Sequence, residues 1–181
     1  MVSQSLQDSA LDAARDCVLA YGVRRTTLTD VARRAGVSRM SIYRRWPDVT
    51  SLVADLMSRE WHNVITASPP TVEGIVTVAR ALREHPLLRK ILEADPETLL
   101  PYVLDRRGTS QQEMLTFLTV ALREGQENGS VRKGEPGRMA RAVLLTVQSF
   151  TLSSAIVVDE SCSADDLDQE LAELLARYLR D

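Results

Sequence analysis

The residues best suited to chemistry in this 181-residue chain are arginines gathered near its N-terminus. Between Arg15 and Trp46 there are eight basic residues and two aspartates, a local charge of 8 − 2 = +6, although the whole chain carries −3. All basic residues except Lys90 and Lys133 are arginines, whose planar guanidinium groups match phosphates and guanine edges. A basic segment on an acidic chain is typical of a phosphate-backbone binder. A solvated arginine-rich face would carry the same charge. The residue pattern within the segment must therefore distinguish a phosphate binder from an ordinary solvated surface.

That pattern predicts three short helices. The first lies within residues 8–21, and Gly22 ends it. Its apolar stripe, at i, i+4, i+7, i+8 and i+11 of a helical face, consists of Ala10, Ala14, Cys17, Val18 and Tyr21.

The next two helices are defined by their ends. Thr27 is the expected N-cap of the second helix, and Asp30, three residues on, can complete a capping box. Gly36 is expected to take the left-handed conformation that ends this helix, and Ser38 to cap the third. Pro47 ends the third helix because the residue before a proline avoids helical dihedrals.

Two short helices joined by a glycine-centred turn, the second rich in arginine, form a helix-turn-helix. Only a short projecting helix fits the major groove, where its N-terminal residues meet base edges while the preceding helix crosses the backbone. A helical hairpin from an ordinary bundle is the alternative. Such hairpins rarely combine a short capped helix, a glycine turn and an arginine cluster, so the sequence favours DNA binding.

The stretch from Tyr21 to Pro47 resembles the signature of the TetR family of bacterial repressors in residue type and spacing. The resemblance implies phosphate contacts from Thr27, Ser38 and Tyr43. The side chains that it implies at base edges or the flanking backbone are Arg39, Met40, Ser41 and Arg44, and we add Arg45 to the DNA-binding set.

Three positions depart from the family pattern. Met40 stands where the family usually has a small residue, Val49 where many members carry a phosphate-binding lysine, and Trp46 where phenylalanine is commoner. Operator specificity is therefore not transferable from any relative.

The rest of the chain shows no β-strand pattern and no repeat, so we predict an all-α fold. We expect a helix-turn-helix domain over residues 1–47 and a helical-bundle regulatory domain, for ligand binding and dimerisation, over 48–181. Residues 48–66 are expected to form the connecting helix, which Asp48 caps.

The two C-terminal helices are the expected homodimer surface. Residues 142–158 contain no charged side chain, and a helix as apolar as this must be hidden nearly all round. The small residues Ser149, Ser153 and Ser154 would permit close helix approach. The TetR resemblance implies a four-helix bundle formed by residues 135–158 and 165–180 with the same helices of a second subunit. A monomeric core is the alternative.

A small-molecule site is expected between the connecting helix and the helices near 71–84, 87–104 and 110–127. Apolar faces are abundant there, and the resemblance implies an effector. The expected lining, which suits an apolar or amphipathic ligand, consists of Trp61, Leu99, Tyr102, Val103, Met114, Phe117, Leu118 and Phe150. The alternative is that these side chains are simply core.

Other classes find little support in the sequence. There is no nucleophile elbow, phosphate loop or zinc spacing, so we expect no enzyme, cofactor or metal. His62 and His85 are isolated, and we expect each at a helix end or the surface. Asp165, Asp166 and Asp168 indicate a charge cluster at the start of the last helix.

We expect no membrane span, because the uncharged run of residues 142–158 is short and interrupted by polar side chains. We also expect no signal peptide, and we therefore predict a cytoplasmic protein.

These observations predict a dimeric repressor that binds a palindromic DNA operator and responds to an unknown small molecule. The alternatives are a DNA binder of the same fold with no effector, or an activator. A helical adaptor that binds only protein would require the arginine face to be incidental.

Overall fold

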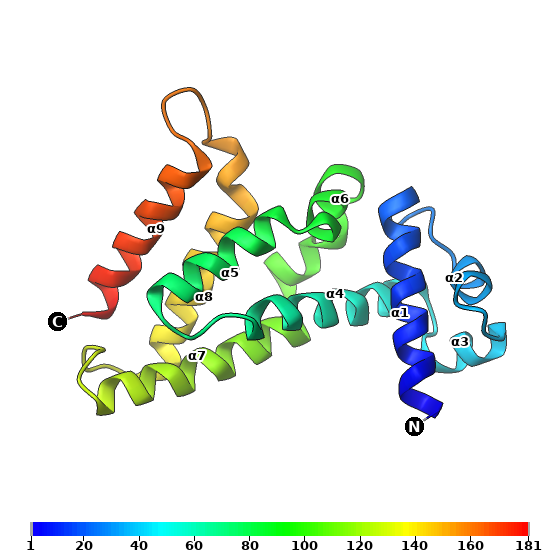
Figure 1. The fold of residues 1–181 in the computed structure, drawn as a ribbon, viewed down its shortest axis with the longest axis horizontal. Coiled ribbons are helices and arrows are strands. Elements are labelled where there is room, and N and C mark those ends of the chain that lie inside the picture. The colour runs from blue at the N-terminus through cyan, green and yellow to red at the C-terminus, as the bar shows by residue number, and fades with distance from the viewer. Residues whose placement is uncertain (1, 181) are drawn as a thin grey trace. The chain divides into compact units, whose positions relative to one another are not determined.

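The computed structural model describes residues 2–180, and all of its regular elements there are helical, which confirms the all-α prediction (Figure 1). The α-helices are α1 (Val2–Tyr21), α2 (Leu28–Ala35), α3 (Arg39–Arg45), α4 (Val49–Thr66), α5 (Val72–Glu84), α6 (Pro86–Ala94), α7 (Thr109–Glu127), α8 (Pro136–Ser153) and α9 (Ala164–Leu179). Short turns of 3-10 or π type are η1 (Pro96–Thr98), η2 (Pro101–Asp105) and η3 (Ser154–Ile156).

The chain folds into two compact units. The first consists of Met1–Trp61 and His85–Gly108, and the second of His62–Glu84 and Thr109–Asp181. α6 therefore belongs to the same unit as the three N-terminal helices, although α5 separates it from them in the sequence.

The first unit buries the apolar faces that the sequence marks on its helices. Ala10, Ala14, Cys17 and Val18 of α1 are buried as predicted. Tyr21, which we placed on the same stripe, is 57% exposed, so that prediction is wrong. Tyr21 is the last residue of α1, whereas the buried residues lie in its earlier turns.

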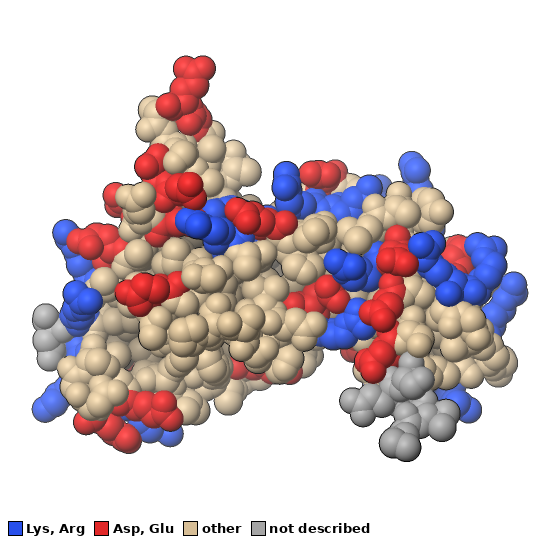
Figure 2. Space-filling model, viewed as in Figure 1, with Lys and Arg blue, Asp and Glu red and all other residues tan. Residues whose placement is uncertain are grey.

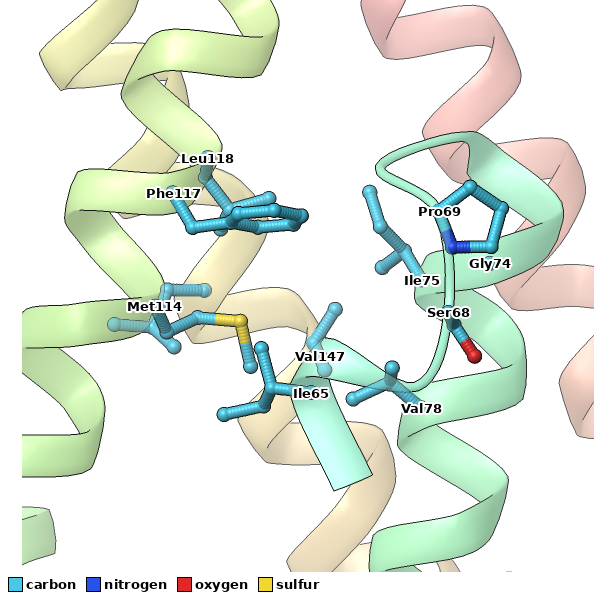
Figure 3. A pocket seen from close by; sticks show the side chains of 11 residues that line it. Ile65, Ser68, Pro69, Gly74, Ile75, Val78, Met114, Phe117, Leu118 and Val147 are labelled. Carbon is cyan, nitrogen blue, oxygen red and sulfur yellow. The ribbon is translucent and has the colours of Figure 1, made fainter. Parts of the chain in front are cut away.

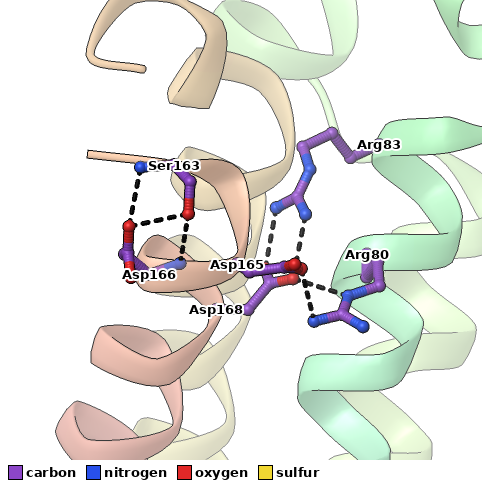
Figure 4. A network of polar contacts seen from close by, with 6 residues as sticks. All are labelled: Arg80, Arg83, Ser163, Asp165, Asp166 and Asp168. Atoms are coloured by element: carbon purple, nitrogen blue, oxygen red, sulfur yellow. Dashed lines mark hydrogen bonds and ion pairs between the residues drawn. The ribbon is translucent and has the colours of Figure 1, made fainter. Parts of the chain in front are cut away.

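The second unit is built around α8, which packs against α5, α7 and α9. Its core combines buried leucine, valine and alanine side chains from all four helices. Arg80 and Arg83 of α5 also reach Asp168 of α9, whose carboxylate is buried (Figure 4). This ion pair joins helices that are more than 80 residues apart in sequence.

α8 differs from its prediction in length and in burial. The regular helix ends at Ser153 and continues as a 3-10 turn to Ile156, so Val157 and Val158 lie outside it. Pro136–Ile156 is long and apolar enough to cross a membrane, but the core helix of a soluble protein has the same properties. The expected all-round burial is not reached within one chain, because Leu145 is 67% exposed.

Candidate DNA-binding surface and ligand cavity

The turn between α2 and α3 is fixed by the residues that the sequence indicated. The hydroxyl of Thr27 accepts a hydrogen bond from the backbone N–H of Asp30 at 3.1 Å, and that of Ser38 accepts from Ser41 N–H at 3.1 Å. Gly36 has φ 67°, a left-handed conformation that side-chain-bearing residues rarely adopt. These caps confirm where the two helices begin and how the first of them ends.

The contacts of Asp30 differ from the predicted capping box, in which its carboxylate would accept from the backbone N–H of Thr27. Its carboxylate accepts from the Thr27 hydroxyl at 2.6 Å and pairs with Arg33, also at 2.6 Å. The negative charge lies near the N-terminus of α2, where the helix dipole favours it. The start of α2 is therefore held by a hydroxyl–carboxylate pair.

α3 has one buried face and one exposed face. Ile42 is fully buried, and the indole N–H of the buried Trp46 donates to the Asp55 carboxylate of α4 at 2.9 Å. These contacts fix α3 and leave its outer face open: Met40 is 77% exposed and Tyr43 is 50% exposed.

The charged side chains on and around α3 differ in how firmly the protein holds them. Arg45 donates to Gln7 of α1 at 2.9 Å and lies over the Trp46 ring. Arg39 and Arg44 are exposed, and neither has a hydrogen-bond or ion-pair partner among the side chains of residues 6–180. Figure 2 shows basic side chains gathered on the surface over α2. α3 thus presents two uncommitted guanidinium groups beside Met40 and Tyr43.

The second unit contains a small apolar cavity of about 20 Å³ (Figure 3), enough for about one water molecule. It lies between the end of α4, the loop before α5, and helices α5, α7 and α8. The residues that line it are Ile65, Ser68, Pro69, Gly74, Ile75, Val78, Met114, Phe117, Leu118, Leu144 and Val147.

Only part of the predicted ligand set meets at this cavity. Met114, Phe117 and Leu118 line it, whereas Phe150 packs on the same core without reaching it. The other four predicted residues belong to the first unit. They are Trp61, Leu99, Tyr102 and Val103.

The chain breaks explain that division. Pro96 and Pro101 break the chain after α6, so that the short turns η1 (Pro96–Thr98) and η2 (Pro101–Asp105) stand in place of a continuous helix. Leu99 is buried within the first unit, and Trp61 packs edge-on against the ring of His85 with the ring centres 5.3 Å apart. Apolarity alone could not reveal which unit each side chain joins.

His85 lies at a helix end, as its position beside Pro86 predicted. It is the N-cap of α6, and its Nδ1 accepts from the backbone N–H of Leu87 at 3.3 Å. Burial lowers the pKa of His85, and the nearby Arg15 acts in the same direction while Glu60 opposes it.

His62 lies at the surface, where its Nδ1 is 3.4 Å from Oε2 of Glu113. In the described part of the chain, no three His, Cys, Asp or Glu residues are grouped to hold a metal.

Comparison with known proteins identifies relatives that share this helix-turn-helix. The family described as bacterial regulatory proteins, tetR family, matches residues 10–56, which include α2, α3 and the turn between them. An uncharacterized HTH-type transcriptional regulator of Mycobacterium tuberculosis is 40% identical over 176 residues, covering 93% of this chain and 92% of the relative. The chain belongs to the TetR family. It is an HTH-type transcriptional regulator.

Solved TetR-family structures share the fold over nearly the whole chain. The repressor QsdR of Rhodococcus erythropolis is 16% identical, with a TM-score of 0.67 over 97% of this chain and 96% of its own. The complex of SmeT with triclosan is 25% identical, with a TM-score of 0.59 over 97% and 92% of the two chains. SmeT represses the multidrug efflux pump SmeDEF of Stenotrophomonas maltophilia.

Sequence reasoning missed most of the cavity wall in this TetR-family protein. Ile65, Ile75, Val78, Leu144 and Val147 have the spacing of ordinary core residues, and nothing local sets them apart. The available signals were the Ser68–Pro70 break and a glycine inside α5, because a glycine within a helix often marks a close approach of another segment.

Proposed function

We propose that this TetR-family regulator is a sequence-specific repressor whose α3 enters the major groove of a palindromic operator. The observation that carries the proposal is the outer face of α3. There Arg39 and Arg44 have no hydrogen-bond or ion-pair partner among the side chains of residues 6–180, and Met40 and Tyr43 are exposed. A buried tryptophan and two capped helix starts hold this face rigidly. Preorganisation reduces the entropic cost of binding.

The proposed roles of the DNA-binding residues follow from their positions. Thr27, Ser38, Tyr43 and Arg45 suit phosphates, because hydroxyls and guanidinium groups at helix starts and flanks position a protein on the backbone. Arg39, Met40 and Ser41 lie in the first turn of α3, the part of a recognition helix that meets base edges. Arg44 lies one turn later in α3, and we assign it to the phosphate backbone of the DNA. We assign DNA binding to residues 1–47, connection to 48–66 and regulation to the remainder of 48–181.

We further propose a homodimer through α8 and α9. Leu145 of α8 and Leu174 of α9 are 67% and 46% exposed, and the outer side of α8 also carries the small Ser149. Exposed leucines on two adjoining helices are costly in a monomer, and a second copy would cover them. Two recognition helices related by a two-fold axis would then read a palindrome.

Release from DNA is proposed to follow ligand binding in the second unit. Support comes from the apolar cavity and from SmeT, a 25% identical protein whose complex contains triclosan. α4 provides a continuous connection, since Asp55 accepts from Trp46 while Ile65 lines the cavity. A ligand that binds one conformer more tightly would shift the equilibrium between DNA-binding and released conformers. The shift cannot exceed the ratio of the ligand's affinities for the two conformers. As a DNA-binding regulator, the protein would act in the cytoplasm.

One observation favours the alternative, a regulator without an effector. The cavity holds about one water molecule, whereas ligand sites are usually several hundred Å³. A ligand therefore needs the wall to move.

Selection of bound sequences from a random DNA pool tests the DNA-binding proposal. We expect enrichment of a palindrome with half-sites about one helical turn, or a multiple of it, apart. Enrichment of no sequence over a heparin-competed background would contradict sequence-specific binding. A reporter gene placed behind the selected operator then distinguishes repression from activation.

A further inference from the structure

The wall of the cavity determines which ligand chemistry it accepts. It has no charged side chain, and its only side-chain hydroxyl, that of Ser68, points away from the space between Met114 and Val78 (Figure 3). A charged group that entered would lose its hydration without gaining a partner. The cavity therefore selects an uncharged ligand.

The segment between α4 and α5 is fastened at its ends and free in its middle. Ala67 N–H donates to Val64 at 3.4 Å, and Gly74 N–H donates to the Thr71 hydroxyl at 3.1 Å. Among the described residues, no hydrogen bond reaches Ser68, Pro69 or Pro70. The prolines have no N–H to donate. Such a segment can move without breaking a backbone hydrogen bond.

Packing on Gly74 is what holds this segment in place. A Cβ atom at Gly74 would collide with the carbonyl oxygen of Pro69, so the oxygen occupies the space that any other residue's side chain would fill. Gly74 lies in the helix α5, where glycine is less favourable than alanine. Its role here is therefore the close approach of Pro69.

The mouth of the cavity lies beside the same segment. Phe117 and Pro69 both line the cavity and both are exposed to solvent. Figure 3 shows them on opposite sides of the space, Phe117 on α7 and Pro69 on the loop. Displacement of Pro69 from Gly74 would widen the opening between them.

We propose that Ser68–Pro69 is a lid seated on Gly74, and that its opening admits an uncharged, slender apolar molecule such as a medium-chain alcohol. The proposal rests on the proposed function only in assigning the effector to this cavity. It adds the route by which the ligand enters the cavity, the contact with Gly74 that closes this route, and the exclusion of charged ligands.

The ligand class is tested with the full-length protein in the absence of DNA. N-phenyl-1-naphthylamine, an uncharged fluorescent probe, is titrated and then displaced with 1-decanol, decanoate or decylammonium. We expect decanol to displace the probe at least tenfold more effectively than either charged compound. Equal displacement by decanoate or decylammonium would overturn the exclusion of charge.

The lid is tested through the rate of probe association. Gly74→Ala should hold the lid away from α5 and raise the association rate at least threefold, while Thr77→Ala, an exposed position on the same helix, should not change it. Pro69→Gly supplies a second variant if Gly74→Ala fails to fold, because a looser segment should also speed association. Unchanged rates in the folded variants would overturn the lid.

A cavity-filling variant locates the probe and separates this inference from the proposed function. Met114→Trp should abolish probe binding, and retained binding would mean that the probe lies elsewhere. Operator binding is measured separately without probe. A protein that binds its operator but no probe overturns the ligand inference alone, whereas probe binding without any DNA binding overturns the proposal of operator binding alone.

Discussion

The carboxylate of Asp95 accepts a hydrogen bond from the backbone N–H of Val23 at 2.7 Å, across 72 residues of sequence. Asp95 is the C-cap of α6 and is 3% exposed, while Val23 follows the glycine that ends α1. Gly22 has φ 84°, and a Cβ atom there would meet the same carboxylate. Arg24 adds an ion pair to Asp95 at 3.4 Å. α6 is thereby fastened to the turn that leads into the helix-turn-helix.

We predict that Asp95→Ala lowers the free energy of unfolding by about 1–3 kcal/mol, because it leaves the partly buried N–H of Val23 without its acceptor. Operator affinity should fall with it, since the turn before α2 loses its support. Urea unfolding and fluorescence anisotropy with labelled operator measure the two effects. Glu97→Ala, which removes only the exposed partner of Arg24, should cost much less, because exposed ion pairs contribute little to stability. Equal losses in the two variants would contradict a role for the buried hydrogen bond.

The sequence was sufficient where structure depends on neighbouring residues. Thr27, Gly36 and Ser38 determine the turn between α2 and α3 through hydrogen bonds and dihedral preferences that span three residues or fewer, so their roles could be predicted. Asp48 likewise caps α4 by accepting from Ser51 N–H at 2.7 Å.

Long-range partners could not be predicted in the same way. Asp168 was predicted only as one of three acids in a charge cluster at a helix start, and it is buried against Arg83, 85 residues earlier. Nothing in its local pattern distinguishes it from Asp165, which is exposed. Membership of a compact unit could not be predicted from local pattern either, because Leu99 and Met114 have similar apolarity but join different units.

Arg44 and Arg39 should affect DNA binding in different ways. Arg44→Ala should weaken binding to all sequences and reduce the salt dependence, by about 0.9 in the slope of log K against log salt for each phosphate that the protein no longer neutralises. Arg39→Ala should instead change base preference, at a cost of about 1–3 kcal/mol for the preferred base. Anisotropy at several salt concentrations, with selected and shuffled duplexes, measures both. Arg123→Ala on α7 removes the same charge from another surface and should have little effect. An unchanged slope for Arg44→Ala would refute the docking.

Leu145→Arg should disrupt the proposed dimer. A charge placed on the exposed side of α8 would lose hydration at an interface with a second copy, while in a monomer it would remain in water. Sedimentation velocity at micromolar concentration should show a dimer for the original chain and a monomer for the variant. Val120→Arg, which makes the same kind of change at an exposed position of α7, should remain dimeric. Dimers of Leu145→Arg would place the interface elsewhere.

The Asp168 ion pair predicts a specific dependence of stability on pH. Asp168 accepts from Arg83 at 2.8 and 2.9 Å and from Arg80 at 2.7 Å (Figure 4). Burial acts to raise the pKa of Asp168, but the hydrogen bonds from Arg83 and Arg80 together hold it below its usual value. A carboxyl whose pKa is lower in the folded state stabilises the fold above the unfolded pKa of about 3.9 and loses that contribution as the pH falls further.

Asp168→Asn should therefore lower the free energy of unfolding by about 2–3 kcal/mol at pH 7, somewhat less than for a fully buried pair because Arg80 reaches solvent. The difference in free energy of unfolding between the two proteins should begin to narrow below about pH 4, where the unfolded original chain takes up a proton at Asp168. It should keep narrowing as the pH falls toward the lower pKa of Asp168 in the folded state. Urea unfolding from pH 7 to pH 3 measures it. Asp165→Asn, whose carboxylate is exposed and pairs with Arg80 alone, should cost less than about 1 kcal/mol at pH 7. A cost for Asp168→Asn that does not change with pH would mean that packing, and not charge, joins α5 to α9.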